Sequence, residues 1–398
     1  MTTLFRDPRA YALLLAATLT IMSNATISPA LPLIEQNFSD TPNAGLLTRL
    51  LVTAPSLVVA FLAPFAGGAA DRFGRRRQLL VGTILYGIAG TAGLWLDSLM
   101  LILVSRLVLG AAVAMIMTSQ SALIGDFYDG DTRARFMGYQ MSAVNFGGFI
   151  FISLAGWFAA MWAMLPFAIY GFAFALLPLL IFGLPRTEVI PTADESSPQH
   201  GEGANGWKIM VGAIAVFSAV TFILFYVLPT QVAYYLSSLG RNDPTEAGHV
   251  MASLTLCAGL SAMTFGPVRG ALGQSGTPAL GLASMSIGFW VLHTSEAIGL
   301  LMTGAAIVGI GMGYVMPCFV NLALGAAPPH RRGMATGIVT TAIFLGQFLS
   351  PLASQPAIAA FGYSDTFAGS SVLLMIMAIV VLIGLRERTP APSSSGAH

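Results

Sequence analysis

Charge in this sequence is concentrated in one short segment, Gly67-Gly68-Ala69-Ala70-Asp71-Arg72-Phe73-Gly74-Arg75-Arg76-Arg77. Apolar runs lead into it from Leu50 and out of it from Leu79. The glycines permit a tight turn and close helix approach. An arginine-rich turn between two apolar helices predicts a place where the chain leaves a bilayer on its cytoplasmic side.

A second candidate for chemistry is Arg106, which we place within an apolar run together with Ser105 and Gly110. Charges inside a membrane span are costly and usually functional. Because arginine does not release a proton at physiological pH, it would act by biasing a neighbouring acid or by contacting an anion. Glu35 is the nearest acid by predicted depth, so we interpret Arg106 and Glu35 as coupling or anion-contact residues. The alternative is an arginine that extends to the membrane surface.

Uncharged polar side chains within apolar runs are candidates for contact with a ligand; they include Asn24, Asn145, Tyr226, Gln231 and Gln347. Each amide is more often a helix–helix hydrogen-bond partner than a ligand contact. An apolar cavity with a few amides suits amphipathic or neutral organic molecules better than sugar phosphates or dicarboxylates. None of the 17 acidic residues lies at the centre of a predicted span.

Composition predicts a membrane protein. The chain is 56% hydrophobic and 9% charged, whereas soluble domains carry about 25% charged residues. The net charge of +1 argues against a nucleic-acid partner. Cys257 and Cys318 lie in apolar runs and are interpreted as packing residues, and no cluster has metal-ligand spacing. No Gly-x-x-x-x-Gly-Lys-Ser/Thr motif is present, so primary active transport would need a separate subunit. We expect no enzyme activity and no metal or cofactor.

A membrane span needs about 20 mostly apolar residues. Twelve such stretches lie near residues 10–33, 46–69, 78–96, 99–122, 136–158, 161–184, 208–236, 246–268, 277–295, 298–324, 333–358 and 365–385. An even number of spans places both termini on one side. The sequence therefore predicts an all-α protein with twelve transmembrane helices.

Basic residues predict the orientation of these helices, because short cytoplasmic loops are rich in lysine and arginine. Of the 18 basic residues, we place Arg49 and Arg241 on the outer side and Arg106 within a span. The others fall on the side of the termini: Arg6, Arg9, Arg72, Arg75, Arg76, Arg77, Arg133, Arg135, Arg186, Lys208, Arg269, Arg331, Arg332, Arg386 and Arg388. Both termini are therefore predicted to be cytoplasmic.

The chain divides into two repeats. A shift of 199 positions brings Gly67 onto Gly266 and Gly74 onto Gly273, and likewise joins other positions: Gly82 with Gly281, Arg133 with Arg332, Gly138 with Gly337, and Gly147 with Gly346. We predict six-helix halves over 1–185 and 208–388. A Pro/Gly/Ser-rich cytoplasmic linker over 186–207 and a disordered tail over 389–398 complete the chain.

The charged segment resembles the signature loop between helices 2 and 3 of the major facilitator superfamily, Gly-x-x-x-Asp-Arg-x-Gly-Arg-Arg. Its defined positions are filled by Gly67, Asp71, Arg72, Gly74, Arg75 and Arg76. The resemblance implies two parallel repeats around a central site. Because helices 1, 5, 7 and 11 line the cavity in that family, it also implies that the substrate cavity includes Asn24, Asn145, Tyr226, Gln231 and Gln347. The resemblance further implies a latch in which Asp71 faces the start of helix 11 near Gly333, and Arg75 pairs with Asp71 and Asp126. That latch would hold the halves together while the protein faces outward; the alternative is a segment that only sets the topology.

The Arg106-x-x-x-Gly110 pattern resembles a second signature, common among proton-driven exporters. Two departures weaken that likeness: Asn24 lies where such exporters often carry an acid, and Gly147-Gly148-Phe149-Ile150 lacks a proline. The resemblance implies a monomeric secondary transporter of the cell inner membrane that exports drug-like or metabolite-like compounds, with proton antiport as the candidate coupling. An importer or facilitator of a small neutral metabolite, and a non-transporting receptor or scaffold, are the alternatives.

Overall fold

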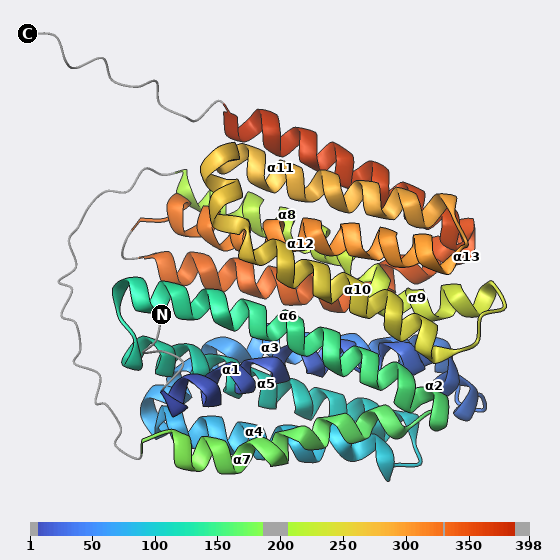
Figure 1. Ribbon diagram of the computed structural model, residues 1–398, viewed down its shortest axis with the longest axis horizontal. Coiled ribbons are helices and arrows are strands. Elements are labelled where there is room, and N and C mark those ends of the chain that lie inside the picture. Colours follow the sequence, from blue (N-terminus) through green and yellow to red (C-terminus); the bar gives the residue numbers. More distant parts are fainter. Residues whose placement is uncertain (1–6, 186–205, 329–330, 387–398) are drawn as a thin grey trace, which may run out of the picture.

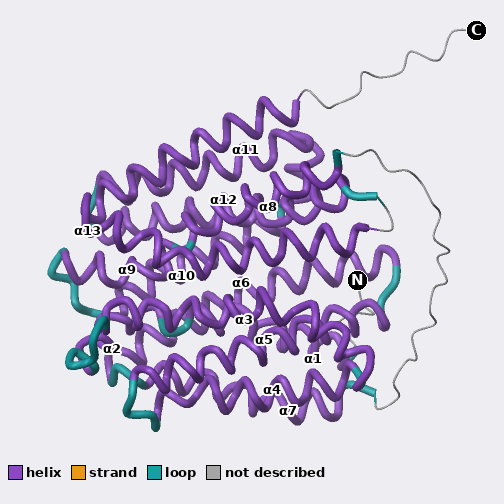
Figure 2. The backbone as a smooth tube through the Cα atoms, turned by 180° about the vertical axis from the view of Figure 1, so that it is seen from behind, coloured by secondary structure: helices purple, strands orange, loops and turns teal. Residues whose placement is uncertain are grey.

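The computed structural model describes residues 7–185, 206–328 and 331–386, and within these ranges it contains helices and no strands (Figure 2). The predicted tail lies outside the described residues, as does the predicted linker except for its last two residues. The all-α fold class is thereby confirmed.

The N-terminal half contains six helical rods. The first begins with α1 (Pro8–Ala25) and continues through a short 3-10 turn into α2 (Leu31–Asn37). The others are α3 (Ala44–Phe73), α4 (Arg75–Thr91), α5 (Leu99–Phe127), α6 (Gly130–Met161), and a 3-10 segment (Leu165–Gly171) that leads into α7 (Phe172–Gly183).

The C-terminal half repeats this arrangement. Its rods are α8 (Trp207–Phe225) with α9 (Val227–Ser238), then α10 (Pro244–Met263), α11 (Phe265–Thr294), α12 (Ile298–Ala326) and α13 (Arg332–Arg386). The helix α13 contains two rods, because Gly362 interrupts it with a φ of 82°. Figure 1 shows the two halves stacked, with α6 beside α10 between them.

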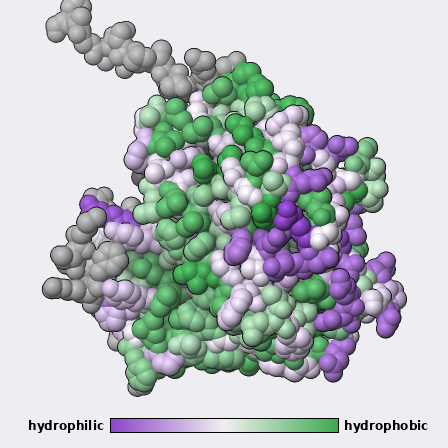
Figure 3. All heavy atoms as spheres, turned by 45° about the vertical axis from the view of Figure 1, so that its right-hand side comes forward, coloured by the Kyte–Doolittle hydropathy of each residue, from purple (hydrophilic) through white to green (hydrophobic). Residues whose placement is uncertain are grey.

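Nine helical stretches in the described ranges are long and apolar enough to cross a membrane. One of these is α13, which makes two crossings, and α4 and α10 complete the twelve. Large apolar side chains such as Phe65, Phe182 and Ile209 are exposed along the flanks. Figure 3 shows this apolar flank beside a hydrophilic end. The exposed flank is what a surrounding lipid phase requires.

Backbone geometry supports the internal repeat. Gly74 and Gly273, which the sequence shift superimposes, have φ values of 97° and 71°, a region that favours glycine. A Cβ at Gly147 of α6 would contact Thr18 of α1, and one at Gly346 of α13 would contact Ala219 of α8. The same pair of rods therefore packs in the same way in each half.

One expectation about the charged segment was wrong. The residues from Gly67 to Phe73 are not a loop but the last two turns of α3, and α4 begins at Arg75. The corresponding stretch of the second half is helical up to Gly273. A single glycine with positive φ is enough to end one helix and redirect the chain into the next.

The end of the bundle where α3 meets α4 carries most of the basic residues, and we call it the basic end (left in Figure 1). The start of α1 lies there too, because the Tyr128 hydroxyl, just past α5, donates to Asp7 at 3.1 Å. Burial and then the neighbouring Asp7 carboxylate raise the pKa of Tyr128, so this phenol remains a donor. We call the other end, where α2 leads into α3, the opposite end.

Candidate functional site

Four side chains from both halves meet in the middle of the bundle, and we call them the central cluster: Asn24, Ser56, Tyr226 and Gln347. Asn24 Nδ2 lies 3.0 Å from Ser56 Oγ, 3.1 Å from Gln347 Oε1 and 3.3 Å from the Tyr226 hydroxyl. Ser56 Oγ donates to Gln347 Oε1 at 2.7 Å. Asn24 and Ser56 belong to the N-terminal half, so every bond to Gln347 or Tyr226 joins the two halves. The cluster contains no charge.

Three residues of this cluster were predicted from the sequence, and Ser56 was not. A lone serine in an apolar helix usually bonds its own backbone, so its type carries little signal. Asn145, also predicted, lies apart from the cluster: its Nδ2 donates to Met141 O in the preceding turn at 2.8 Å. Its Cβ packs against Gly259 of α10, which makes Asn145 a helix–helix contact between the halves.

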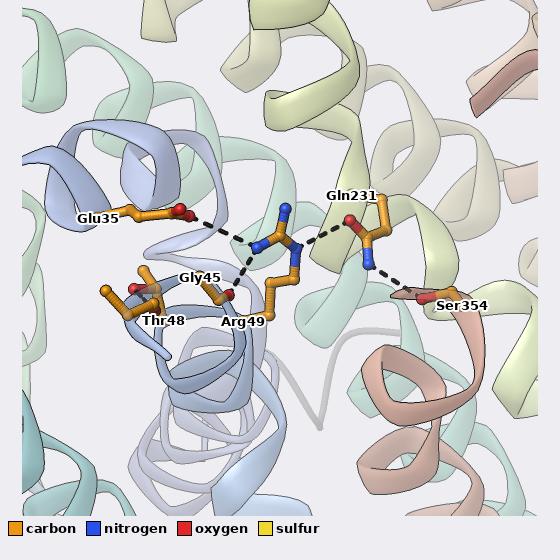
Figure 4. A network of polar contacts seen from close by, with 7 residues as sticks. Glu35, Gly45, Thr48, Arg49, Gln231 and Ser354 are labelled. Atoms are coloured by element: carbon orange, nitrogen blue, oxygen red, sulfur yellow. Dashed lines mark hydrogen bonds and ion pairs between the residues drawn. The ribbon is translucent and has the colours of Figure 1, made fainter. Parts of the chain in front are cut away.

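Gln231, the fifth predicted cavity residue, belongs to a second polar group nearer the opposite end (Figure 4). Arg49 Nε donates to Gln231 Oε1 at 3.0 Å, and Gln231 Nε2 donates to Ser354 Oγ at 3.0 Å. The Arg49 guanidinium carbon lies 3.6 Å from the centre of the Tyr234 ring. We call Arg49, Glu35, Gln231, Tyr234 and Ser354 the Arg49 cluster.

The structure corrects two expectations about charge. Arg106 is not the only basic residue within a span, because Arg49, near the opposite end, lies inside α3 with 8% of its area exposed. Glu35 does not pair with Arg106: its Oε2 lies 3.5 Å from Arg49 Nη1. The signal for this pair was present, because Arg49 is only a few residues inside its predicted span and one short connection away from Glu35.

Arg106 is fully buried in the N-terminal half, which excludes the surface-extended alternative. Its Nη2 donates to Gly90 O at 2.8 Å, and its guanidinium carbon lies 4.6 Å from the ring centres of both Phe167 and Tyr170. Its Nε and Nη1 have no hydrogen-bond partner in the described part of the chain. Aromatic faces therefore replace a carboxylate as its neighbours.

The charged segment forms a compact ion-pair group at the basic end. Arg75 Nη2 lies 2.7 Å from Asp71 Oδ1, and Arg75 Nη1 bonds Asp126 at the end of α5. Burial lowers the pKa of Arg75, but the bonds to both carboxylates outweigh that effect and raise it. Arg76 Nη2 reaches Ile181 O at 2.8 Å, while Arg72 lies over Phe73. These contacts all lie within the N-terminal half.

Among the described residues, side-chain hydrogen bonds between the halves occur in the middle and at the opposite end of the bundle. Along α3 and α13 they run from Arg49 and Ser56 to Ala60, whose carbonyl accepts from Thr341. Further toward the basic end, Gly67 and Gly337 continue the same helix faces, and a Cβ at either would meet nothing within 4 Å. The helices α6 and α10 also touch only toward one end. Near the opposite end Gly156 packs on Gly248, whereas toward the basic end a Cβ at Gly138 or Gly266 would meet nothing within 4 Å.

The two halves therefore bond each other in the middle and at the opposite end, and there is open space beside these glycines at the basic end. A Cβ at Gly333, at the start of α13, likewise meets nothing within 4 Å, and the Asp71 carboxylate accepts from Arg75 of its own half.

Comparison with known proteins gives the family. The Major Facilitator Superfamily profile matches residues 13–241 and 232–398. The chain is 23% identical over 343 residues to the quinolone resistance protein NorA of Staphylococcus aureus, covering 82% of this chain and 84% of that protein. It is 25% identical over 202 residues to Multidrug resistance protein 1 of Bacillus subtilis, about half of each chain.

Solved structures give the same fold. The inward open xylose transporter XylE from E. coli superimposes with a TM-score of 0.75 at 16% identity, covering 97% of each chain. The human organic anion transporter MFSD10 superimposes with a TM-score of 0.69 at 17% identity, covering 94% of this chain and 99% of that one. Because the family profile spans nearly the whole chain and the fold agrees with it, this protein belongs to the Major Facilitator Superfamily of membrane transporters.

Proposed function

We propose that this transporter exports amphipathic or neutral organic compounds by alternating access around the central cluster. The observation that carries the proposal is the chemistry of that cluster. Its side chains are uncharged, lie between the halves and bond one another across them. The names of the relatives NorA and Multidrug resistance protein 1, which refer to resistance, favour export over import.

The central cluster provides a site whose bonds a ligand can replace. Neutral hydrogen bonds contribute about 1 kcal/mol net, so a compound with a donor or acceptor can displace them at small cost. Phe222 and Phe225 pack near Tyr226, with ring centres 6.4 and 5.7 Å from that of Tyr226. Such an aromatic wall binds apolar groups with little demand on their shape. A compound with several negative charges would find no counter-charge in this cluster.

Proton antiport is the coupling that we propose, with Glu35 and Arg106 as the residues to test. Glu35 is partly exposed beside Arg49 and lines the cavity at the opposite end. Arg106 is a buried cation that would contribute through the field it exerts on nearby groups. The proposal also places the protein as a monomer in the cell inner membrane, with the basic end and both termini cytoplasmic, as the positive-inside rule predicts.

Transport by purified protein in inside-out vesicles tests this function. A panel of amphipathic cations, neutral compounds and dianions would be measured with and without an imposed pH gradient. We expect the amphipathic cations and the neutral compounds to accumulate in a gradient-dependent way, and the dianions not to accumulate. Gln347→Ala should raise the half-saturating concentration about 10-fold, from the loss of one to two hydrogen bonds. Asn145→Ala, an amide outside the cluster, is the matched control.

Two results would contradict the proposal. Accumulation of dianions alone would contradict the substrate class. Equal effects of Gln347→Ala and Asn145→Ala would contradict the location of the site. Transport of a small neutral metabolite down its own gradient, without a response to pH, would instead favour the facilitator.

A further inference from the structure

We propose that Arg49 is the gate residue of the opposite end, and that its own half neutralises it, so that the gate opens without separating an ion pair. The inference rests on the alternation between two states that the proposed function requires, but not on the substrate or on the direction of transport. It concerns the Arg49 cluster, which no part of that function uses except Glu35.

The contacts of Arg49 divide into two sets. Within the N-terminal half, its Nη1 donates to Gly45 O at 2.6 Å and lies 3.5 Å from Glu35 Oε2. Across the halves, it donates to the amide oxygen of Gln231 at 3.0 Å and lies over the ring of Tyr234. Among the described residues, the charged partner is thus on the near side, and the far partners Gln231, Tyr234 and Tyr363 are neutral.

The position of Arg49 suits a gate. A cavity of about 510 Å³ opens at the opposite end, and its lining includes Glu35, Gly45 and Tyr234. Arg49 lies below this cavity with 8% exposure, one turn of α3 outside Thr53 and two turns outside Ser56 of the central cluster. A second contact also joins the two halves near Gln231: Ser28 Oγ donates to Pro229 O of the other half. The Arg49 cluster therefore separates the outer cavity from the central cluster.

The division of charge has an energetic consequence. If the carboxylate were on the C-terminal half, opening would leave two uncompensated charges at a partly dry interface, which is strongly unfavourable. Because Glu35 is on the same half, separation of the halves does not pull Arg49 away from its carboxylate partner, and only neutral hydrogen bonds and an aromatic contact are lost. A carboxylate placed at position 231 would change this, because opening would then break an ion pair.

The test measures the state of the gate directly. Cys257 and Cys318 are replaced by serine, and spin labels are attached at Asn37→Cys and Ser238→Cys, two exposed positions on opposite halves at this end. Distance distributions in lipid report a short, closed population and a long, open one. We expect Gln231→Glu to lower the open fraction at least ~10-fold, because it adds a charge pair across the gate. Gln36→Glu adds the same charge at an exposed site and should leave the distribution unchanged.

A second pair of variants keeps the test decisive if the buried glutamate prevents folding. Tyr234→Leu removes the aromatic face over Arg49 and should raise the open fraction ~3-fold, whereas Tyr234→Phe keeps the face and should not. Unchanged populations in both Gln231→Glu and Tyr234→Leu would overturn the gate. So would equal shifts in Tyr234→Leu and Tyr234→Phe. Failure of export, with these shifts present, would contradict the proposed function and leave the gate intact.

Discussion

Asp71 and Asp126 both pair with Arg75, yet replacing each by asparagine should distinguish a latch from a purely topological segment. Asparagine keeps the shape and one acceptor of each side chain but removes the charge. Asp126 is 14% exposed and Arg75 is 19% exposed, whereas Asp71 is 56% exposed. The two substitutions therefore remove pairs of very different strength.

The magnitudes follow from this burial. A charge-assisted bond between mostly buried partners contributes about 1.5–3 kcal/mol, so loss of the Asp126 charge corresponds to roughly 10- to 150-fold in an equilibrium. An exposed i, i+4 pair contributes about 0.3–0.5 kcal/mol, so the Asp71 pair alone corresponds to roughly 2-fold. Asp71 would also bind the N-terminal end of α13 at Gly333 if the latch forms when the protein faces outward. The dipole of that helix would then add about 0.3–2 kcal/mol.

Initial transport rates in vesicles, normalised to inserted protein, decide between the two roles. A latch predicts that Asp71→Asn lowers the rate about 3- to 70-fold, beyond the loss of its pair with Arg75 alone. Asp129→Asn, the same change at an exposed carboxylate of the same end, is the control and should transport normally. A rate for Asp71→Asn within about 2-fold of wild type would refute the latch and leave the segment a topological signal.

Three further predictions concern the topology of the chain, the role of Arg106 and one packing contact. Single cysteines at Ser196 and Ser364, in a chain without its native cysteines, should be labelled from opposite sides of the membrane; labelling of both from one side would refute the predicted topology. Arg106→Lys keeps the charge but loses the planar stacking, and it should lower gradient-driven transport about 10-fold while ligand binding persists; full activity of Arg106→Ala would exclude any role in coupling. Gly309→Ala should sharply reduce folded protein in detergent, because a Cβ there would lie 2.1 Å from Leu254 O; normal thermal stability would contradict that packing.

The sequence predicted the elements and the family without any tertiary information. Twelve apolar stretches, the charged segment and the repeat are local patterns, and a bilayer permits little other than helices for such stretches. The position of Gly74 between two spans was likewise readable, since glycine is favoured where φ is positive. The sequence also singled out Asn24, Tyr226 and Gln347 as cavity candidates, because they are polar side chains in apolar runs on helices that line the cavity in the resembling family.

Only the tertiary structure decided which polar groups meet. Asn24 and Gln347 are more than 300 positions apart, and their contact depends on the tilt and rotation of two helices in different halves. Gln231 could equally have joined them, but it follows the turn between α8 and α9 and lies nearer the opposite end, where it accepts from Arg49. The partner of Glu35 also depended on the tertiary structure, because the depth of a residue along its helix does not specify which neighbouring helix its side chain faces. Spacing along a chain thus predicts helices and their order, whereas the pairing of side chains is set by the packing of one helix face on another.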